Sequence, residues 1–225
     1  MEQFLKIAPN ITRCTYTRDT AVRNDSLFID PSKIQGTPVS ECPLAIRDIR
    51  FLPREIFRSV PDGEPQIKVI LTVDGQRTFI ENLKEVYDRQ AWRVEITLAF
   101  RPEEHIYGLG QDEDGVFDKR GHKEYLYQHN MKTPMPMFVS SLGYAVLFNC
   151  ACLMVFDDSG DVCRITLECV EQLDFFVITG TMDQIIAGYR ELTGRAAPMP
   201  DWVLGYWQSK ERFESQKELE QVLKK

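Results

Sequence analysis

Three histidines and a run of carboxylates are the residues of this chain best suited to proton transfer. The histidines are His105, His122 and His129, and the carboxylates occupy positions 112–114. An acid and a base placed near a sugar's ring oxygen and anomeric hydroxyl would support aldose epimerisation. Nothing in the sequence couples one histidine to a particular glutamate, and histidines at strand ends and in loops are mostly structural. An aldose 1-epimerase is therefore one enzymatic interpretation, without a defined acid–base pair.

The carboxylates occur among turn-forming residues. Positions 112–114 follow Gly110 in a polar stretch, and positions 157–158 precede Ser159 and Gly160. Aspartates in such surroundings commonly hydrogen-bond to the backbone of a turn. Neighbouring residues on one exposed loop do not place two carboxyl groups opposite each other. We therefore expect solvated turns at both places.

The cysteines offer thiol or metal chemistry. Cys150 and Cys152 form a C-x-C pair in an apolar run, and on a strand their side chains would point to opposite faces. We therefore expect no metal site and no cofactor here. With no secretory context, all six cysteines are expected to be reduced and mostly buried thiols. They are Cys14, Cys42, Cys150, Cys152, Cys163 and Cys169.

Composition limits the class of protein and its partners. Of the 225 residues, 43% are hydrophobic and 27% are charged, as in soluble globular domains. The net charge of −7, without a basic cluster, argues against a nucleic-acid partner. No apolar run approaches the roughly 18 residues of a membrane helix, so we expect no membrane partner. The first residues lack the features of a signal peptide, which favours a cytoplasmic protein.

Alternating and β-branched patterns predict strands through the first two thirds of the chain. Residues 92–100 alternate apolar and polar side chains, as a half-buried strand does. Asp74 and Gly75 follow a predicted strand at 67–73 and are typical of a hairpin turn. The other predicted strands are 11–17, 144–148, 153–156, 163–170 and 173–178. This content predicts a mainly β fold, a large antiparallel β-sandwich.

The pattern changes after residue 180. Residues 181–184 form a capping box that begins a helix, and Gly194 ends that helix. Residues 202–207 are nearly all apolar, which predicts a strand buried on both faces. Residues 215–218 form a second capping box, followed by an amphipathic helix. The expected divisions are a β-sandwich domain, a helix with linker, and a β/α unit, at residues 1–180, 181–199 and 200–225.

The last division is half of a βαβ unit, and its parallel partner strand is missing from the sequence. A free strand edge invites pairing with another chain. Residues 200–225 are therefore expected to be poorly anchored, domain-swapped or packed against another chain, which makes a homo-oligomer one expected outcome.

Several motifs together resemble one known family. They carry the sequences YGLGQ, DKRG, QHN, FVSSLGY and PDWVLGYWQSK, at residues 107–111, 118–121, 128–130, 138–144 and 200–210. In this order they resemble the N-terminal domain of glycoside hydrolase family 31, which contains α-glucosidases and α-xylosidases, and its passage into the catalytic barrel. The resemblance spans residues 105–225, whereas residues 1–104 fit by pattern alone.

The resemblance implies a galactose-mutarotase-like β-sandwich packed against a (β/α)₈ barrel, of which residues 200–225 would be the truncated beginning. The family is retaining: one carboxylate attacks the anomeric carbon and a second acts as acid and then base. Both are aspartates on later barrel strands, so we expect no catalytic residue in this chain. The implied partners are an α-linked oligosaccharide or glycoside and the missing catalytic barrel.

The resemblance also indicates substrate-binding residues. It places residues 128–130 in a loop beside the barrel mouth, where Asn130 stands at a position that carries Asp in some relatives. An amide donates to and accepts from sugar hydroxyls, so we predict that Asn130 and its neighbour His129 bind substrate. The alternative is that Asn130 caps the turn before 132–134. Trp207, near the C-terminal end of the predicted strand, is the third predicted substrate contact.

Two further interpretations remain beside the glycosidase and the epimerase. A stand-alone carbohydrate-binding β-sandwich would account for the strands but not for the predicted β/α unit at 200–225. A domain that only supports a barrel would account for both and would contact no sugar.

Overall fold

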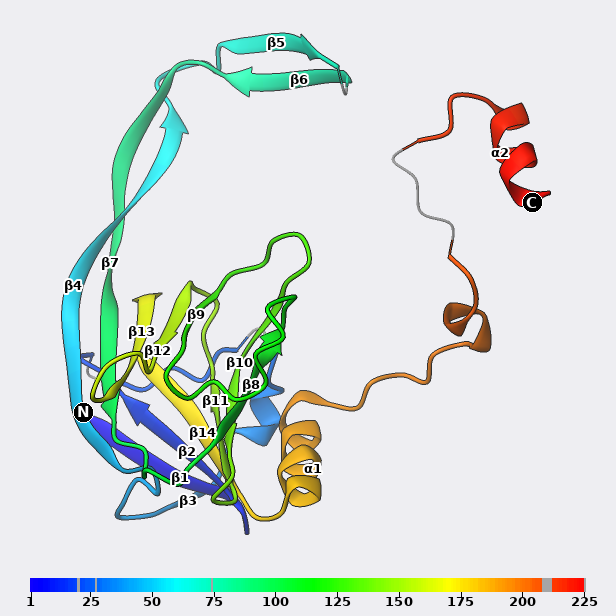
Figure 1. Ribbon diagram of the computed structural model, residues 1–225. Helices are drawn as coiled ribbons and strands as arrows, with labels where there is room; N and C mark the ends of the chain where they lie inside the picture. The colour runs from blue at the N-terminus through cyan, green and yellow to red at the C-terminus, as the bar shows by residue number, and fades with distance from the viewer. Residues whose placement is uncertain (20, 27, 74, 208–211, 225) are drawn as a thin grey trace. The chain divides into compact units, whose positions relative to one another are not determined.

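The computed structural model describes residues 1–19, 21–26, 28–73, 75–207 and 212–224. The described chain divides into two compact units, Met1–Gly194 and Arg195–Lys225. All the described strands belong to the first unit, where they form two facing antiparallel sheets and a projecting ribbon (Figure 1). The predicted mainly β, antiparallel fold is confirmed.

The larger sheet has seven strands in the order β3-β1-β2-β14-β11-β10-β8. Its central strand, β14, is buried along nearly its whole length, which explains its continuous apolar sequence. In this order the strands span Thr37–Pro38, Glu2–Ala8, Ile11–Tyr16, Leu173–Thr179, Tyr144–Phe148, Thr133–Ser140 and Ile106–Gln111. A short 3₁₀ helix, η1 (Pro31–Lys33), precedes β3.

The second sheet has five strands in the order β4-β7-β13-β12-β9. They span Ile46–Pro61, Leu83–Leu98, Cys163–Val170, Met154–Asp157 and Lys123–Leu126. The predicted strands 144–148, 153–156, 163–170 and 173–178 are confirmed as β11, β12, β13 and β14. The turn expected beside Ser159 and Gly160 joins β12 to β13.

Side-chain alternation along β14 separates two hydrophobic clusters. Phe175 and Val177 belong to the core between the sheets, whereas Phe176 and Ile178 face helix α1 (Met182–Thr193). The core side chain Phe138 is 0% exposed, and full burial of such a side chain stabilises the fold by roughly 1.5–3 kcal/mol. The sandwich therefore has a core of its own.

Helix α1 confirms the predicted capping box. The Thr181 hydroxyl accepts a hydrogen bond from the Gln184 amide, and the Gln184 side chain accepts one from the Thr181 amide. Gly194 follows the helix, and its N–H donates to the carbonyl of Arg190 at 3.0 Å. At Gly188, an added Cβ would lie 2.7 Å from Ile178 Cγ2, so glycine lets the helix approach β14 closely. None of the described helices has the length and apolar character needed to cross a bilayer.

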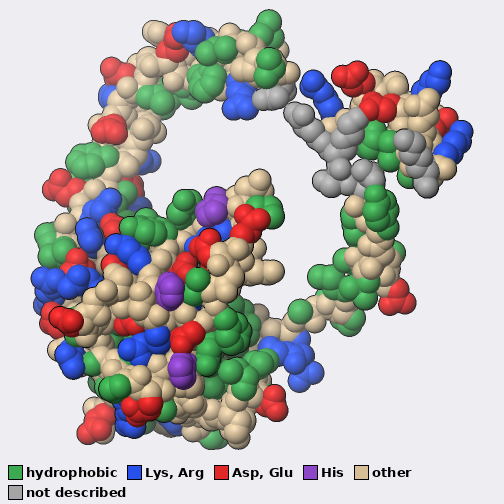
Figure 2. Space-filling model, in the orientation of Figure 1, with side chains coloured by type: hydrophobic (Ala, Val, Ile, Leu, Met, Phe, Trp, Pro, Cys, Tyr) green, Lys and Arg blue, Asp and Glu red, His purple; other side chains and the backbone are tan. Residues whose placement is uncertain are grey.

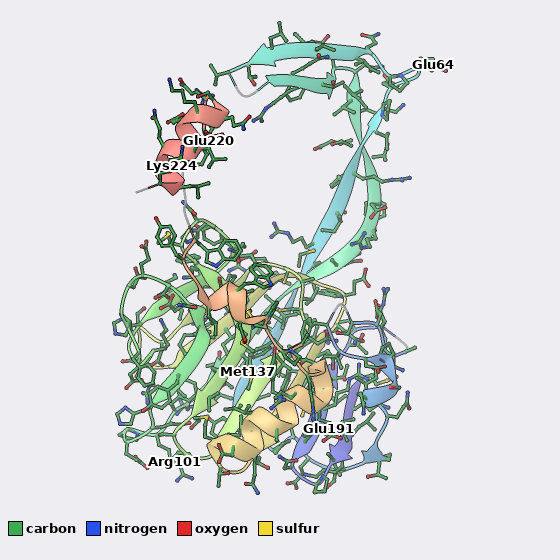
Figure 3. The ribbon with its side chains drawn as sticks, turned by 90° about the vertical axis from the view of Figure 1, so that its right-hand side faces the viewer. Glu64, Arg101, Met137, Glu191, Glu220 and Lys224 are labelled. Carbon is green, nitrogen blue, oxygen red and sulfur yellow. The ribbon has the colours of Figure 1, made fainter. Side chains whose placement is uncertain are left out.

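Strands β4 and β7 extend beyond the sandwich as a ribbon. Among the described residues, β7 pairs with β13 only between Trp92 and Leu98, whereas its pairing with β4 continues to Leu83. Strands β5 (Ile67–Thr72) and β6 (Gly75–Ile80) continue this arm as a separate two-stranded sheet. Glu64, labelled in Figure 3, lies in the connection from β4 to β5. The predicted strand 67–73 is confirmed, but Asp74 of the predicted turn lies outside the described residues.

The strand predicted at 202–207 is wrong. Asp201–Leu204 forms the 3₁₀ helix η2, and Trp202, Tyr206 and Trp207 are exposed. The amide of Val203 donates to Pro200 at 3.0 Å and that of Gly205 to Trp202 at 3.2 Å. These local bonds replace a strand ladder, because no described strand pairs with this segment. Gln208, Ser209 and Lys210 of the motif lie outside the described residues.

The second predicted helix is confirmed as α2 (Gln216–Leu223). Ser215 Oγ accepts from the Glu218 amide at 3.3 Å, as predicted. The Glu218 carboxylate accepts from the Glu214 amide instead of the Ser215 amide, so the predicted capping box is only half formed.

Candidate functional site

The segment YGLGQ fixes where the loop between β8 and β9 begins. Gly108 and Gly110 have φ of +98° and +105°. Added Cβ atoms would lie 2.8 Å from the carbonyl oxygen of Met137 and 2.1 Å from that of Thr133, both on β10. Glycine at both positions therefore allows the backbones of β8 and β10 to approach each other closely. The whole connection from 112 to 132, which includes strand β9 of the other sheet and is called the 112–132 loop below, leaves and re-enters the larger sheet at this pair of strands.

Asp118, of the DKRG motif, organises the turn that leads to β9. Its Oδ1 accepts from the amides of Ile106 and Arg120, each at 3.1 Å. Its Oδ2 lies 2.6 Å from His105 Nδ1, so this nitrogen donates to the carboxylate. Burial of Asp118 acts in the opposite direction, but the hydrogen bonds from His105 and from the two amides lower the pKa of Asp118. His105 is thereby engaged with an aspartate and holds the turn.

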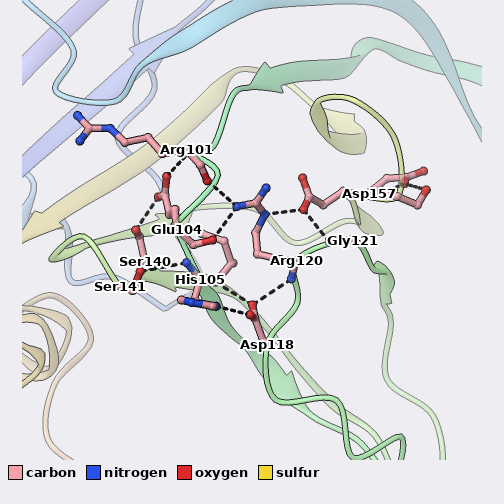
Figure 4. Close-up of polar contacts among 12 residues, drawn as sticks. Arg101, Glu104, His105, Asp118, Arg120, Gly121, Ser140, Ser141 and Asp157 are labelled. Carbon is pink, nitrogen blue, oxygen red and sulfur yellow. Dashed lines mark hydrogen bonds and ion pairs between the residues drawn. The ribbon is translucent and has the colours of Figure 1, made fainter.

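Arg120 of the same motif ties this turn to the sandwich, as Figure 4 shows. Its Nη1 donates to the carbonyls of Arg101 at 2.9 Å and Glu104 at 2.6 Å, and its Nε donates to Asp158 at 2.8 Å. The Asp158 carboxylate also accepts from the amide of Gly121. The Asp158 side chain therefore holds the DKRG turn and is not a solvated turn residue.

Glu104 binds two side chains of the FVSSLGY motif. Its carboxylate, in a residue that is 4% exposed, accepts from Ser140 Oγ at 2.5 Å and Tyr144 Oη at 2.6 Å. Ser141 Oγ accepts from the His105 amide at 3.0 Å (Figure 4). A buried carboxylate with several donors is well stabilised, so this network is a support for the loop.

Four charged side chains form a buried cluster beneath the loop. Lys119 Nζ lies 2.7 Å from Glu124 Oε1 and 3.3 Å from Asp112 Oδ2. Lys132 Nζ lies 3.1 Å from Glu124 Oε2 and 4.0 Å from Asp112 Oδ2. The side chains are 5–14% exposed. The expected turn at 112–114 is present, since Asp112 Oδ1 accepts from the Asp114 amide at 3.2 Å, and Glu113 and Asp114 are exposed. Asp112 itself is not solvated as expected, because its other carboxylate oxygen links the start of the loop to Lys119 and to Lys132.

The same cluster bears on metal binding. Ligand atoms of Asp112, Asp114 and Glu124 lie within 4.8 Å of one another, a spacing that a hard cation could use. The ammonium groups of Lys119 and Lys132 already neutralise the two carboxylates nearest to them. Burial favours the neutral amine, but hydrogen bonds to Glu124 and Asp112 raise the pKa of Lys119, which stays charged. The residues form an ion-pair network and do not fit a metal site.

The loop tip carries two of the three predicted substrate-binding residues. The amide of Lys132 donates to the carbonyl of His129 at 3.2 Å, and Met131 has a φ of +67°. These features define a tight turn with Asn130 and Met131 at its centre. His129 Nδ1 lies 2.7 Å from the carbonyl oxygen of Asn130, and its ring is 5.0 Å from that of Tyr127. Because a carbonyl can only accept, Nδ1 carries the proton and Nε2 is left as an acceptor in neutral His129.

The Asn130 side chain is exposed, and within the described part of the chain its amide has no hydrogen-bond partner. The backbone, not this amide, closes the turn. The structure thus places Asn130 beside His129 at an accessible tip. Both nitrogen and oxygen of the amide are available to a ligand.

Trp207, the third predicted contact, belongs to the other unit. Its Nε1 donates to the carbonyl of Val203 at 2.8 Å, and its ring centroid lies 5.5 Å from that of Trp202. The two tryptophans form an exposed aromatic pair on and beside η2. His129 and Asn130 belong to the first unit.

Comparison with known proteins gives relatives of one kind. No family model matches the chain. Over 153 residues the chain is 35% identical to an α-xylosidase of Saccharolobus solfataricus, which covers 64% of this chain and 21% of that protein. Over 162 residues it is 33% identical to α-xylosidase A of Aspergillus niger, and the match covers 65% of this chain and 22% of that protein. The chain spans about a fifth of the length of these relatives.

Solved structures agree in fold. The family 31 α-xylosidase of Xanthomonas citri matches 99% of this chain and 41% of its own, with a TM-score of 0.68 and 15% identity. A family 31 α-xylosidase from a soil metagenome, solved with xylose, matches 99% of this chain and 36% of its own, with a TM-score of 0.66 and 20% identity. The chain resembles the N-terminal region of glycoside hydrolase family 31. The resemblance recognised in the sequence is confirmed.

Sequence reasoning missed the charged residues that hold the 112–132 loop. In the sequence, Lys119 and Arg120 stand out only as part of the DKRG motif, and no motif marks Glu124 or Lys132. The sequence does carry lysines and carboxylates of opposite charge between Gly110 and residue 132, and this was the only indication of ion pairs there. Such charges are usually solvated, so only the fold reveals that Lys119, Glu124 and Lys132 meet Asp112 in one cluster.

Proposed function

We propose that this chain is the N-terminal region of a retaining α-glycosidase that acts on α-xylosides or α-glucosides. In this proposal it supports a catalytic barrel and contributes the tip of the 112–132 loop to the substrate site. The observation that carries the proposal is the 35% identity to an α-xylosidase over 64% of this chain. The sandwich supplies a rigid base for the loop, as the buried networks around Glu104 and Lys119 indicate.

The chemistry of the proposal requires two carboxylates from outside the chain. A retaining enzyme needs one carboxyl group as nucleophile and one as acid and base, about 5–5.5 Å apart. Asp112 and Glu124 have carboxylates near each other, but two lysine ammonium groups bind them. A free nucleophile and a protonatable acid are therefore not provided by this pair. We infer that the chain alone hydrolyses neither aryl α-xylosides nor aryl α-glucosides.

The loop tip is suited to a neutral, hydroxyl-rich ligand. The Asn130 amide can donate and accept at once, and neutral His129 presents Nε2 as an acceptor. The ion pairs beneath the tip hold it in place, so that little conformational entropy is lost when a sugar binds. We propose that Asn130 and His129 contact the sugar. Trp207, on the exposed aromatic pair, is proposed as a further contact.

A chimera tests the proposal. This chain would replace the equivalent N-terminal region of the Saccharolobus solfataricus α-xylosidase, to which it is 35% identical. Hydrolysis of aryl α-xyloside and aryl α-glucoside would be compared between the chimera, the unaltered enzyme and the isolated chain. We expect activity from the chimera and none from the isolated chain.

Two outcomes would contradict the proposal. A folded chimera without activity on either glycoside would show that this region does not support such a barrel. Turnover by the isolated chain, abolished by substituting one of its own carboxylates, would show that the catalytic groups lie within it. If the chimera is inactive and the isolated chain binds xylose in a calorimetric titration, a stand-alone carbohydrate-binding domain would replace our proposal.

A further inference from the structure

A pocket of about 430 Å³ is lined by residues of the sandwich unit, none of them from the 112–132 loop that carries Asn130. Three thiols line it, those of Cys150, Cys152 and Cys169. Cys150 and Cys152 belong to the connection between β11 and β12, and Cys169 lies on β13. Arg23 and Arg89, also in the lining, have side chains 48% and 53% exposed, so solutes reach this pocket from the solvent.

The expectation that Cys150 and Cys152 face opposite ways is wrong. Residues 149–153 lie outside the strands, and the backbone bends at Cys152. The strand rule of alternating faces therefore does not apply, and both residues line the same pocket. Cα atoms two residues apart are at most about 7 Å apart even when extended, and a bend shortens this distance. Disulfides span Cα separations of about 4.4–6.8 Å, so a bond between these neighbours is geometrically accessible.

The two sulfurs have different surroundings. The hydrogen bond from Cys150 is the main cause that lowers the pKa of Cys152 to about 7, from an ordinary value of 9.0. The hydrogen bond to Cys152 and burial raise the pKa of Cys150. Cys152 is therefore the first of the two thiols to ionise as the pH rises.

We propose that Cys150 and Cys152 form a dithiol site that exchanges with low-molecular-weight disulfides and closes to an intramolecular disulfide. In the first step the Cys152 thiolate attacks one sulfur of the small disulfide. Its S–S bond breaks, a small thiolate leaves, and Cys152 carries a mixed disulfide. The leaving thiolate takes the proton of Cys150.

In the second step the Cys150 sulfur attacks the Cys152 sulfur of the mixed disulfide and releases the second small thiolate. The protein loses two electrons and the small disulfide gains them, so that two small thiols are formed for each protein disulfide. Thiolate character and solvent access decide which cysteines react in this way. Cys152 combines both, and Cys150 is in contact with it.

The test uses the reduced, folded chain and oxidised glutathione at neutral pH, followed by acid quenching, intact mass and peptide mapping. In the wild type we expect the peptide with Cys150 and Cys152 to lose two hydrogens and to carry no glutathione. In the C150S variant the second step is blocked, so a glutathione adduct is expected to persist on Cys152. In the C152S variant we expect no adduct on Cys150.

Cys169→Ser is the matched control, since it removes a thiol of the same pocket and should leave the result unchanged. A wild-type peptide that stays fully reduced, or a bond from Cys152 to Cys169, would overturn the proposal. An adduct on Cys150 in place of Cys152 in the wild type would do the same. The wild-type map needs no substitution, so a variant that fails to fold does not remove the test.

Discussion

Lys119 Nζ and Glu124 Oε1 lie 2.7 Å apart, and their side chains are only 5% and 7% exposed. The pair joins the DKRG turn to β9, and Lys132 and Asp112 extend it across both ends of the loop. A charged pair in such surroundings contributes little net stability when complete, but removing one partner leaves the other charge buried. Its effect is to fix the position of the loop. This relation leads to the first prediction.

Substitution of Lys119 by Met should destabilise the chain by about 3 kcal/mol, because Glu124 and Asp112 would lose their central partner. The measurement is urea denaturation followed by tryptophan fluorescence. Lys68→Met is the control: it breaks an ion pair with Glu81 whose side chains are 54% and 51% exposed. That change should cost less than about 1 kcal/mol. Equal effects of the two substitutions would contradict a special role for the buried cluster.

Two glycines test the close approach of β8 and β10. Gly110→Ala should destabilise the fold by more than about 2 kcal/mol, because its Cβ would lie 2.1 Å from the carbonyl oxygen of Thr133 at a φ of +105°. Gly115→Ala, at a φ of +68° with open space around it, should cost about 1 kcal/mol. Thermal denaturation of both variants provides the comparison. If Gly110→Ala is the milder change, the β8–β10 contact does not constrain the loop.

Alkylation should report the ionisation of Cys152. Its pKa is lowered to about 7, so the reactive thiolate is present above pH 7 and is lost as the pH falls below it. The rate of iodoacetamide labelling, followed by peptide mapping between pH 5 and 9, should reach half its maximum near pH 7. Cys169, whose pKa is raised by burial, is the internal control and should label only at higher pH. The other charged residues lining this pocket are Arg23, Asp25, Arg89, Glu171 and Asp174.

A half-maximum for Cys152 near 9, its ordinary value, would contradict the contact with Cys150. Two variants at Cys150 test whether a donor at this position lowers the pKa of Cys152. A serine hydroxyl at this position can still donate, so the half-maximum should stay below 9. Cys150→Ala removes the donor and should move the half-maximum upward.

The sequence predicted most strands that have one buried face and missed those at an edge. Residues 173–178 are apolar because the other sheet covers one face of β14 and helix α1 covers the other, and residues 163–170 contain an apolar pattern because β13 turns one face to the core. β13 and β14 follow these bounds closely. Strand β4 carries Pro53 and Pro61 with many charges between them, a composition tolerated at a sheet edge. An edge strand pairs with one neighbour only, and its sequence therefore shows a weak alternation of apolar and polar residues. The long arm was therefore not foreseen.

The failure at 202–207 has a different physical cause. An apolar run can be a buried strand only where other strands supply hydrogen bonds and cover both faces. Among the described residues no strand does so, and Pro200 and Asp201 favour a helical turn, which forms as η2. For the candidate site, the motifs located the loop and its exposed tip. They could not reveal that Lys119 and Glu124 meet in the interior, because that depends on how β9 packs against its neighbours.

The last prediction concerns Asn130. In the active chimera, Asn130→Ala should lower kcat/KM for the aryl α-xyloside about three- to tenfold, since a hydrogen bond to a neutral hydroxyl contributes roughly 0.5–1.5 kcal/mol. The melting temperature should not change, because within the described residues the Asn130 amide has no hydrogen-bond partner. Asn149→Ala is the matched control. Its amide donates to the buried Asp174 at 2.8 Å and its oxygen accepts from Ser26 at 2.7 Å, so it should lower the melting temperature and leave kcat/KM per folded molecule unchanged. If Asn130→Ala behaves like Asn149→Ala, the loop tip is structural and the domain supports the barrel without contacting the sugar.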